Sequence, residues 1–302
     1  NIVSAITYKN VRNNKVKIID GFYAFSKEHI AIFNTTNNGS YNYVDISPSV
    51  NQDAGHVYTY NFWIFIPPIN NIPSEEFEII PLFIKGSKEK VNYIKGYATT
   101  FSSNSNGNGK HFLIKNPLIN LKRKKNNNKI NEISIELNAQ NHPDLIKNNP
   151  AESHLEGINF IGIKNLDQRK DLMNKWNMFT FVVSETNSES LLQNNQANIK
   201  LYLNGHQYLN SFLDSAKKPI SGLNNSIKRN YGNFYINPDK KDKVILSDIT
   251  FFNYLISEKD IVDIFNKGCK KTLAFIPTAG KSVNYTEHEA SLESHNEVIE
   301  QI

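Results

Sequence analysis

Two glutamates stand four residues apart in the run EISIE, Glu132 to Glu136, near the middle of the 302-residue chain. In a β-strand, Glu132, Ser134 and Glu136 would share one face, because successive side chains point to opposite sides. A retaining glycoside hydrolase uses two carboxylates as nucleophile and acid/base, with the carboxyl groups about 5 Å apart. Positions i and i+4 of a strand lie farther apart, but their side chains can converge across a concave sheet. The run therefore raises the hypothesis of a hydrolase pair.

Plain alternation explains the same run without any chemistry. Ile133, Ile135 and Leu137 would face the core, while Ser134 and the two glutamates would form a solvated face. Because this pattern accounts for every residue of the run, we favour an ordinary half-buried strand. We therefore predict that the protein is not an enzyme and has no catalytic residue, with the two glutamates catalytic only under the hydrolase alternative.

The other reactive side chains form no stronger constellation. No two of the eight histidines have the spacing of a zinc motif such as HExxH, so we predict neither a metal site nor a cofactor. Cys269 precedes two lysines that could lower its pKa, but no general base stands at a defined spacing from it. We predict a half-buried structural thiol.

The basic run LKRKKNNNK, residues 121–129, holds five lysine and arginine residues beside an Asn-rich turn. It has no interleaved aromatic residues on which bases could stack. We therefore favour a solvated hairpin tip over a contact with phosphate or an acidic partner, and we predict no nucleic-acid partner. The net charge of +5 and the pI near 8.9 are only mildly basic, in agreement.

The composition indicates a folded domain without disulfides. A hydrophobic fraction of 39% is enough for a sizeable core, and the single cysteine excludes an internal disulfide.

No run of about 18 apolar residues is present to span a membrane. The chain begins at Asn1 rather than methionine, so we expect a missing upstream part that could carry a signal or an anchor. Sequons for N-glycosylation occur at Asn34, Asn38, Asn224 and Asn284.

Short β-branched or aromatic runs bounded by Asn, Gly, Pro and Ser predict many short strands. YTYNFWIFI is apolar on both faces, which is typical of a central strand. Near the end, Ser257 and Asp260 form a capping box before an apolar stripe at Ile261, Ile264 and Phe265, and a glycine at 268 ends the predicted helix. The predicted strands are GFYAF (21–25), HIAIF (29–33), YNYVDI (41–46), YTYNFWIFI (58–66), FEIIPLFIKG (77–86), HFLI (111–114), INEISIEL (130–137), WNMFTFVVS (176–184) and NIKLYLNG (198–205).

These signals predict an all-β fold, a jelly-roll sandwich of two antiparallel sheets with one short helix near the C-terminus. We divide the chain into a lead-in, residues 1–17, a jelly-roll domain, residues 18–268, and a C-terminal arm, residues 269–302. Two long polar segments, residues 102–110 and 139–157, are predicted loops.

The order of the motifs resembles the laminin-G-like, concanavalin A-like jelly roll. The motifs that carry this resemblance are NYVDISPSVNQDAGHVYTYNFWIFI, PLFIKGS, KWNMFTFVVS, IKLYLNGHQ and SDITFFNYLISEKDI. It covers residues 18–268, with the closest likeness from Lys175 to Gly268. The first motif is also similar to laminin-G-like proteins encoded by nucleocytoplasmic large DNA viruses. The resemblance implies the fold, whereas the function must be argued from a site, because one fold hosts many functions.

The resemblance also bears on the candidate residues. Related hydrolases carry Glu-x-Asp-x-Glu on a concave face, and Ser134 stands where the central carboxylate would tune the pair. Trp63 and Trp176 could line a sugar site, but each lies in an apolar strand, so we predict burial in the core. Calcium is the one ion left open, because laminin-G-like domains bind it at the sandwich rim. The carboxylates available for it are Asp45, Asp53, Asp239 and Asp242.

We predict a non-enzymatic laminin-G-like recognition or structural module, associated with the virion of a large DNA virus as a minor capsid or surface protein. Its partners would be other virion proteins or cell-surface glycans, and it would lie in the host cytoplasm during assembly. A lectin-like carbohydrate-binding module is one alternative, and it would present exposed aromatic residues together with Asn and Asp. A glycoside hydrolase using Glu132 and Glu136 is the other.

Overall fold

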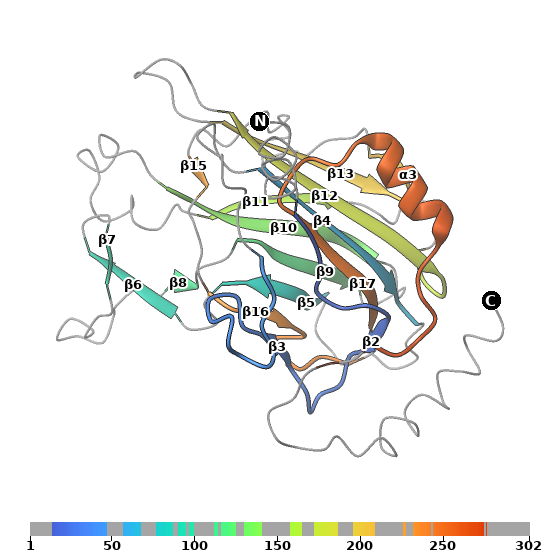
Figure 1. Cartoon of the computed structure of the whole chain (residues 1–302), viewed down its shortest axis with the longest axis horizontal. Coiled ribbons are helices and arrows are strands. Elements are labelled where there is room, and N and C mark those ends of the chain that lie inside the picture. Colours follow the sequence, from blue (N-terminus) through green and yellow to red (C-terminus); the bar gives the residue numbers. More distant parts are fainter. Residues whose placement is uncertain are drawn as a thin grey trace, which may run out of the picture.

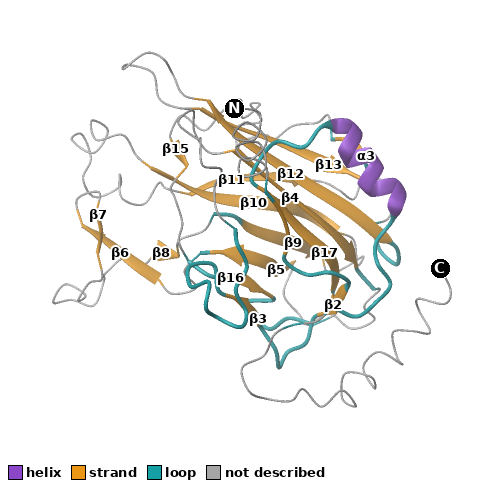
Figure 2. Cartoon of the chain, viewed as in Figure 1, coloured by secondary structure: helices purple, strands orange, loops and turns teal. Residues whose placement is uncertain are grey.

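The computed structural model describes residues 14–46, 57–67, 77–86, 90–94, 97–99, 112–113, 116–124, 130–140, 158–164, 172–186, 196–208, 226–227, 232–242, 244–274 and 276. Most of this part of the chain forms two antiparallel sheets that pack face to face, with one helix near the C-terminal end (Figures 1 and 2). The predicted all-β sandwich is therefore confirmed. Within these residues, no helix is long and apolar enough to cross a membrane.

Sheet A contains β1 (Lys15–Lys17), β2 (Phe22–Ala24), β4 (Val57–Phe65), β12 (Trp176–Thr186), β13 (Gln196–Leu203), β14 (His206–Gln207) and β17 (Ile245–Phe252). Its order is β1-β17-β4-β12-β13-β14, and β2 also pairs with β17. The run YTYNFWIFI is β4, which lies between β17 and β12 as predicted for a central strand. The turn after β13 has positive φ at Asn204 and Gly205, as its Asn-Gly sequence predicts.

Sheet B contains β3 (Ala31–Phe33), β5 (Phe77–Lys85), β9 (Leu118–Lys124), β10 (Ile130–Gln140), β11 (Ile158–Lys164), β15 (Ser226–Ile227) and β16 (Phe234–Ile236). Its order is β11-β10-β9-β5-β16-β3, and β15 pairs with β10. A small third sheet has the order β7-β6-β8, formed by β6 (Lys90–Ile94), β7 (Tyr97–Thr99) and β8 (Phe112–Leu113). The predicted strand at residues 41–46 is wrong, because this run forms a loop.

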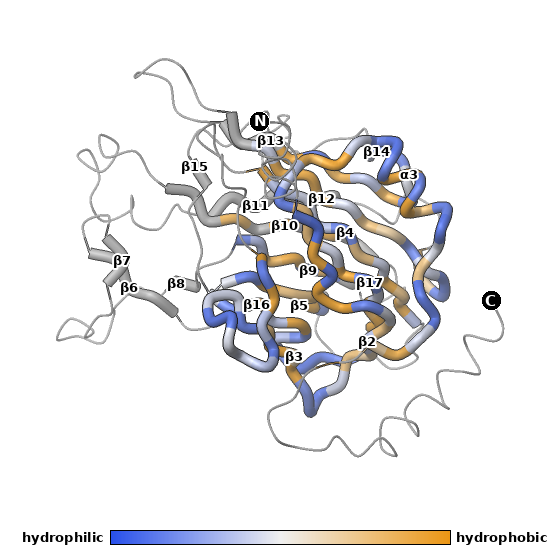
Figure 3. The backbone as a smooth tube through the Cα atoms, in the orientation of Figure 1, coloured by the Kyte–Doolittle hydropathy of each residue, from blue (hydrophilic) through white to orange (hydrophobic). Residues whose placement is uncertain are grey.

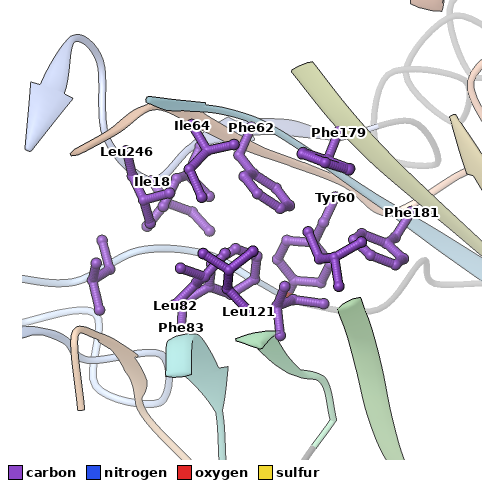
Figure 4. Packing of buried hydrophobic residues seen from close by; sticks show 14 of the residues in the cluster. Ile18, Tyr60, Phe62, Ile64, Leu82, Phe83, Leu121, Phe179, Phe181 and Leu246 are labelled. Atoms are coloured by element: carbon purple, nitrogen blue, oxygen red, sulfur yellow. The ribbon is translucent and has the colours of Figure 1, made fainter. Parts of the chain in front are cut away.

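The core lies between the two sheets and is rich in aromatic rings. Tyr60 and Phe62 of β4 point at Phe83 of β5, and Figure 4 shows these side chains meeting between the sheets. Phe62 and Phe83 are both 0% exposed, and their ring centroids lie 5.1 Å apart in an edge-to-face arrangement. Alternating inward residues of both sheets therefore build one continuous apolar layer.

A buried hydroxyl in this core gives a stability prediction. Tyr23 of β2 is 6% exposed, and its hydroxyl is a buried polar atom without a hydrogen-bond partner in the described part of the chain. Tyr23→Phe removes that unpaired group, so we expect the free energy of unfolding to rise by about 1 kcal/mol in urea denaturation. Tyr58→Phe is the matched control, because the Tyr58 hydroxyl donates to Asn116 Oδ1 at 2.6 Å and its loss should lower the stability. A less stable Tyr23→Phe variant would contradict this account.

Helix α3 (Glu258–Lys267) covers part of the outer face of sheet A (Figure 1). The predicted capping box is present: the Ser257 hydroxyl accepts from the Asp260 backbone N–H, and the Asp260 carboxylate accepts from the Ser257 backbone N–H. Ile261 is fully buried, and Gly268 has the predicted positive φ, although its ψ of 175° is extended. The helix therefore begins and ends where its sequence signals predict.

Trp63 is buried as predicted, but on the outer face of sheet A rather than between the sheets, whereas the predicted burial of Trp176 is wrong. Trp63 is 5% exposed, but it points outward from β4 and stacks on Phe265 of α3, with centroids 5.7 Å apart. Trp176 is only half-buried and lies 5.6 Å from the Phe65 ring. On a central strand covered by a helix the outward face is as apolar as the inward one, so strand composition alone does not choose between them.

Two short pieces beyond residues 18–268 pair with sheet A. Strand β1 pairs with β17, and after α3 the chain returns to β2, where the Phe22 N–H donates to the Thr272 carbonyl at 2.8 Å. Gly21 permits this approach, because its φ is +114° and a Cβ there would lie 2.3 Å from the Thr272 oxygen. The division at residues 17 and 268 remains a prediction.

Candidate functional site

The acidic run EISIE lies in β10, between β9 and β11. Ile133, Ile135 and Leu137 are 0% exposed, as alternation predicts. Ser134, however, is only 3% exposed and pairs with Asn120 of β9, which is 7% exposed. The predicted solvated face is therefore wrong at Ser134. Alternation tells which side of a sheet a residue faces, but it does not tell whether that side is covered.

The hydrolase pair stays a prediction. Glu132 and Glu136 lie opposite Lys122 and Leu118 in the register of β9, and the side chains of both glutamates lie outside the described part. Ser134, which stands between them on the same face, is closed to solvent.

No group of three or more His, Cys, Asp or Glu side chains that could hold a metal ion occurs among the described residues. Of the carboxylates considered for calcium, Asp242 pairs with Lys27, with Oδ2 and Nζ 3.3 Å apart, and Asp53 lies outside the described residues. Calcium binding remains a prediction without a described site.

Cys269 is half-buried, as predicted, and packs against the cluster that contains Trp63 and Phe265. Burial, together with the nearby Asp248 carboxylate, raises its pKa to about 11. Lys271 lowers this pKa, as its position suggested, but burial outweighs that effect and the net shift is upward.

Several predicted features fall outside the described residues. These include the loop 102–110, residues 141–157 of the second loop, the tail after residue 276, and the sequons at Asn224 and Asn284. In the basic run 121–129, only the side chains of Leu121 and Lys122 are described. The predictions made for these features remain open.

A polar loop that follows β3 presents the most exposed large aromatic side chain of the described chain. We name residues 34–46 the Tyr41 loop, because Tyr41 is 60% exposed. Figure 3 shows the chain around β3 and β16 in mostly hydrophilic colours outside the strands. From Asn34 to Val44 the loop has no formally charged side chain, only Asn, Thr, Ser, Gly, Tyr and Val.

Asparagine side chains fix the first half of the Tyr41 loop. The Asn34 Oδ1 atom accepts from the backbone N–H groups of Thr36 at 2.9 Å and Asn37 at 2.8 Å. One turn later the Asn37 Oδ1 atom accepts from the Gly39 N–H at 3.0 Å, and the Asn37 carbonyl accepts from the Ser40 N–H at 3.0 Å. Each side chain stands in for a backbone acceptor, so local bonds set the path of the loop.

The second half of the loop closes the edge of sheet B. The Asn42 side-chain amide donates to the Ile32 carbonyl of the edge strand β3 at 2.8 Å. The backbone bonds Asn34 N–H to Asn42 O and Val44 N–H to Asn34 O fold the loop back along this edge, at 3.0 and 2.8 Å. Tyr41, immediately before Asn42, is therefore attached to the sheet through its neighbour, and the edge is capped by the chain itself.

Lys85 fastens the base of the Tyr41 loop. Its ammonium donates to the Thr35 hydroxyl at 3.1 Å and to the Gly232 carbonyl at 2.5 Å, and the Thr35 hydroxyl donates to the same carbonyl at 2.8 Å. Lys85 is 4% exposed, and burial lowers its pKa to about 8. The loop is thus tied to the end of β5 and to the chain before β16.

The sequence did not predict a site in this loop. β-branched and aromatic residues at 41–46 favoured a strand, although the preceding run NTTNNGS is typical of turns. The loop forms instead of a strand because the side chains of Asn34 and Asn37 accept hydrogen bonds from nearby backbone N–H groups. Of its two sequons, Asn38 has an exposed side chain, whereas the Asn34 oxygen is already occupied by its turn.

No family model matches the chain, and no curated protein sequence matches it. Among solved structures, the receptor-binding domain of botulinum neurotoxin D is 11% identical over 84% of this chain and 48% of that chain, with a TM-score of 0.44. The binding domain of serotype G is 14% identical over 84% and 50%, with a TM-score of 0.38. The serotype D ligand-binding domain in complex with N-acetylneuraminic acid is 11% identical over 85% and 46%, with a TM-score of 0.41. The chain spans about half the length of these solved chains, and scores this low carry no inference about its function.

Proposed function

We propose that this chain is a non-catalytic recognition module and that the Tyr41 loop is its contact surface. The observation that carries this is an aromatic side chain, 60% exposed, on a loop whose path is fixed by its own hydrogen bonds. A tyrosine supplies a large contact area with few rotatable bonds, and a pre-ordered loop loses little entropy on binding. The resemblance to laminin-G-like domains supports the same function.

The loop favours a neutral glycan as the ligand class. A charged partner is selected by opposite charges, and the Tyr41 loop carries only one formally charged side chain, Asp45 near its end. Amide and hydroxyl groups match the alternating donors and acceptors of a sugar, while the Tyr41 ring offers an apolar face to its C–H groups. This combination is the one expected of the lectin-like alternative.

Tyr41→Ala tests the contact surface. We expect the dissociation constant for the best neutral glycan found on an array to rise about tenfold or more, because the stacking area is lost. Leu255→Ala is the matched control: Leu255 is 48% exposed near the start of α3, so its removal should leave binding unchanged. An array without hits, or equal binding by both variants, would remove the Tyr41 loop as the contact surface.

The non-catalytic part of the proposal has its own test. It is supported by the closed position at Ser134, between the two glutamates. Incubation with β-glucans should release no sugar. Hydrolysis that disappears in the Glu132→Gln variant would make the protein a glycoside hydrolase instead.

A virion-associated location, with other virion proteins as further partners, is proposed on the resemblance to proteins of large DNA viruses. Mass spectrometry of purified particles should find the chain in amounts typical of a structural or surface component. Its absence from the particles would overturn the location and leave the glycan test unaffected.

A further inference from the structure

The Tyr41 loop contains an Asn-Gly pair, Asn38 and Gly39, that is exposed to solvent. Glycine has no Cβ, so its backbone nitrogen can approach the side-chain carbonyl carbon of a preceding asparagine. Both residues are exposed, and the Asn38 side chain makes no hydrogen bond with any described residue. The Gly39 N–H donates to Asn37 Oδ1 at 3.0 Å, and because this bond lies at the surface, it opens at little cost.

A second Asn-Gly pair, Asn204 and Gly205, provides an internal comparison. Here the Asn204 Oδ1 atom accepts from the Met178 N–H at 2.8 Å, and its Nδ2 atom donates to Asn177 Oδ1 at 3.1 Å. Asn177 is itself 0% exposed. Freeing the Asn204 side chain therefore requires opening of the hairpin and of the contacts below it, which costs far more than opening an exposed turn.

We propose that Asn38 is a site of spontaneous deamidation in the folded protein and that Asn204 is protected. The Gly39 nitrogen forms a bond to Asn38 Cγ as the Cγ–Nδ2 bond breaks. The Gly39 amide proton passes to solvent, and the leaving nitrogen takes up a proton and departs as ammonia. Water then opens the cyclic imide at either carbonyl, which leaves aspartate or isoaspartate at position 38.

The modification changes the Tyr41 loop in two ways. It places a negative charge in a stretch, Asn34 to Val44, that has no formal charge. Isoaspartate also adds a backbone carbon inside the turn closed by the Ser40 N–H and the Asn37 carbonyl, so that bond is lost. The contact surface therefore alters with the age of the protein. The deamidation chemistry holds whether or not this loop binds a glycan.

Peptide mapping by mass spectrometry, with separation of aspartate from isoaspartate, tests the proposal on the whole chain incubated in mildly alkaline buffer. We expect Asn38 to convert about tenfold or more faster than Asn204 in the folded protein, and at a similar rate in denaturant. Equal rates in the folded protein, or no conversion of Asn38, would overturn the proposal. The pairs Asn106–Gly107 and Asn108–Gly109 lie outside the described residues and serve only as further readings in the same map.

Two variants identify the chemistry. Gly39→Ala should slow conversion of Asn38, because the added methyl group obstructs attack by the nitrogen, whereas Asn37→Ala should speed it, because the Gly39 N–H loses its acceptor. A rate unchanged in both variants would overturn the mechanism. These rates are measured without any ligand. A glycan array without hits therefore does not bear on the deamidation proposal, and unchanged deamidation rates do not bear on glycan binding.

Discussion

Replacement of Asn237 by alanine is expected to lower the free energy of unfolding by about 3 kcal/mol or more. Asn237 is 0% exposed at the end of β16, and its side-chain amide donates to three backbone carbonyls. These belong to Ser26 at 2.8 Å, Lys241 at 2.9 Å and His29 at 3.3 Å. One buried side chain therefore joins the loop before β3 to the loop before β17.

The size of the effect follows from what alanine leaves behind. The Lys241 N–H, which donates to the Asn237 Oδ1 atom at 2.6 Å, loses its acceptor together with the three carbonyls that lose their donor. A buried polar group left unsatisfied costs about 1–3 kcal/mol, although the loops can relax or admit water at some of these positions. Asn237 also has a φ of +53°, a conformation that asparagine tolerates better than alanine does.

Chemical denaturation of the variant, followed by fluorescence and circular dichroism, measures this loss. Asn266→Ala is the matched control, because Asn266 is exposed on α3 and its replacement should change the stability by no more than about 0.5 kcal/mol. A loss below about 1 kcal/mol at position 237 would mean that the two loops hold together without this side chain.

The sequence predicted the features that depend on local periodicity. Alternation in β10 predicted burial of Ile133 and Ile135, and the two-sided apolar run predicted the central place of β4. The capping box at Ser257 was equally local, because both of its hydrogen bonds join residues three positions apart. Such signals are readable because the residues that interact are close in the chain.

The features that could not be predicted from the sequence depend on contacts between distant segments. Ser134 was expected in solvent because nothing in its own strand says that the outer face is covered. Asn237 is one asparagine among many in this chain, and its three carbonyl partners include two that lie about 210 residues away, at separations of 211 and 208. Lys85 ends an apolar strand, where a charged residue normally reaches solvent, yet the structure buries it against Gly232. The tertiary fold decides which polar groups are buried, and the local hydrophobic pattern of the sequence does not predict it.

Lys85→Met is the second substitution with a large expected effect, and its signature is a dependence on pH. Burial lowers the pKa of Lys85 from 10.5 to about 8 in the folded protein. Below pH 8 both states hold the proton, and the folded state bears the whole cost of burying the charge. Between about pH 8 and 10.5 the folded protein releases the proton while the unfolded chain keeps it, so the contribution of Lys85 to stability rises with pH. The rise amounts to roughly 3 kcal/mol for a shift of this size.

Cys269 acts in the opposite direction over much of the same range, so the wild-type curve alone cannot isolate Lys85. Burial raises the Cys269 pKa from 9.0 to about 11, so the unfolded chain loses this proton first and stability falls as pH rises between these values. Because Cys269 contributes equally to wild type and variant, the difference between their unfolding free energies cancels it. We expect Lys85→Met to gain stability relative to wild type near neutral pH and to lose this advantage by about pH 10.5. A difference that stays constant across this range would show that the Lys85 pKa is close to its ordinary value, and that its hydrogen bonds to Thr35 and Gly232 offset the cost of burying the ammonium.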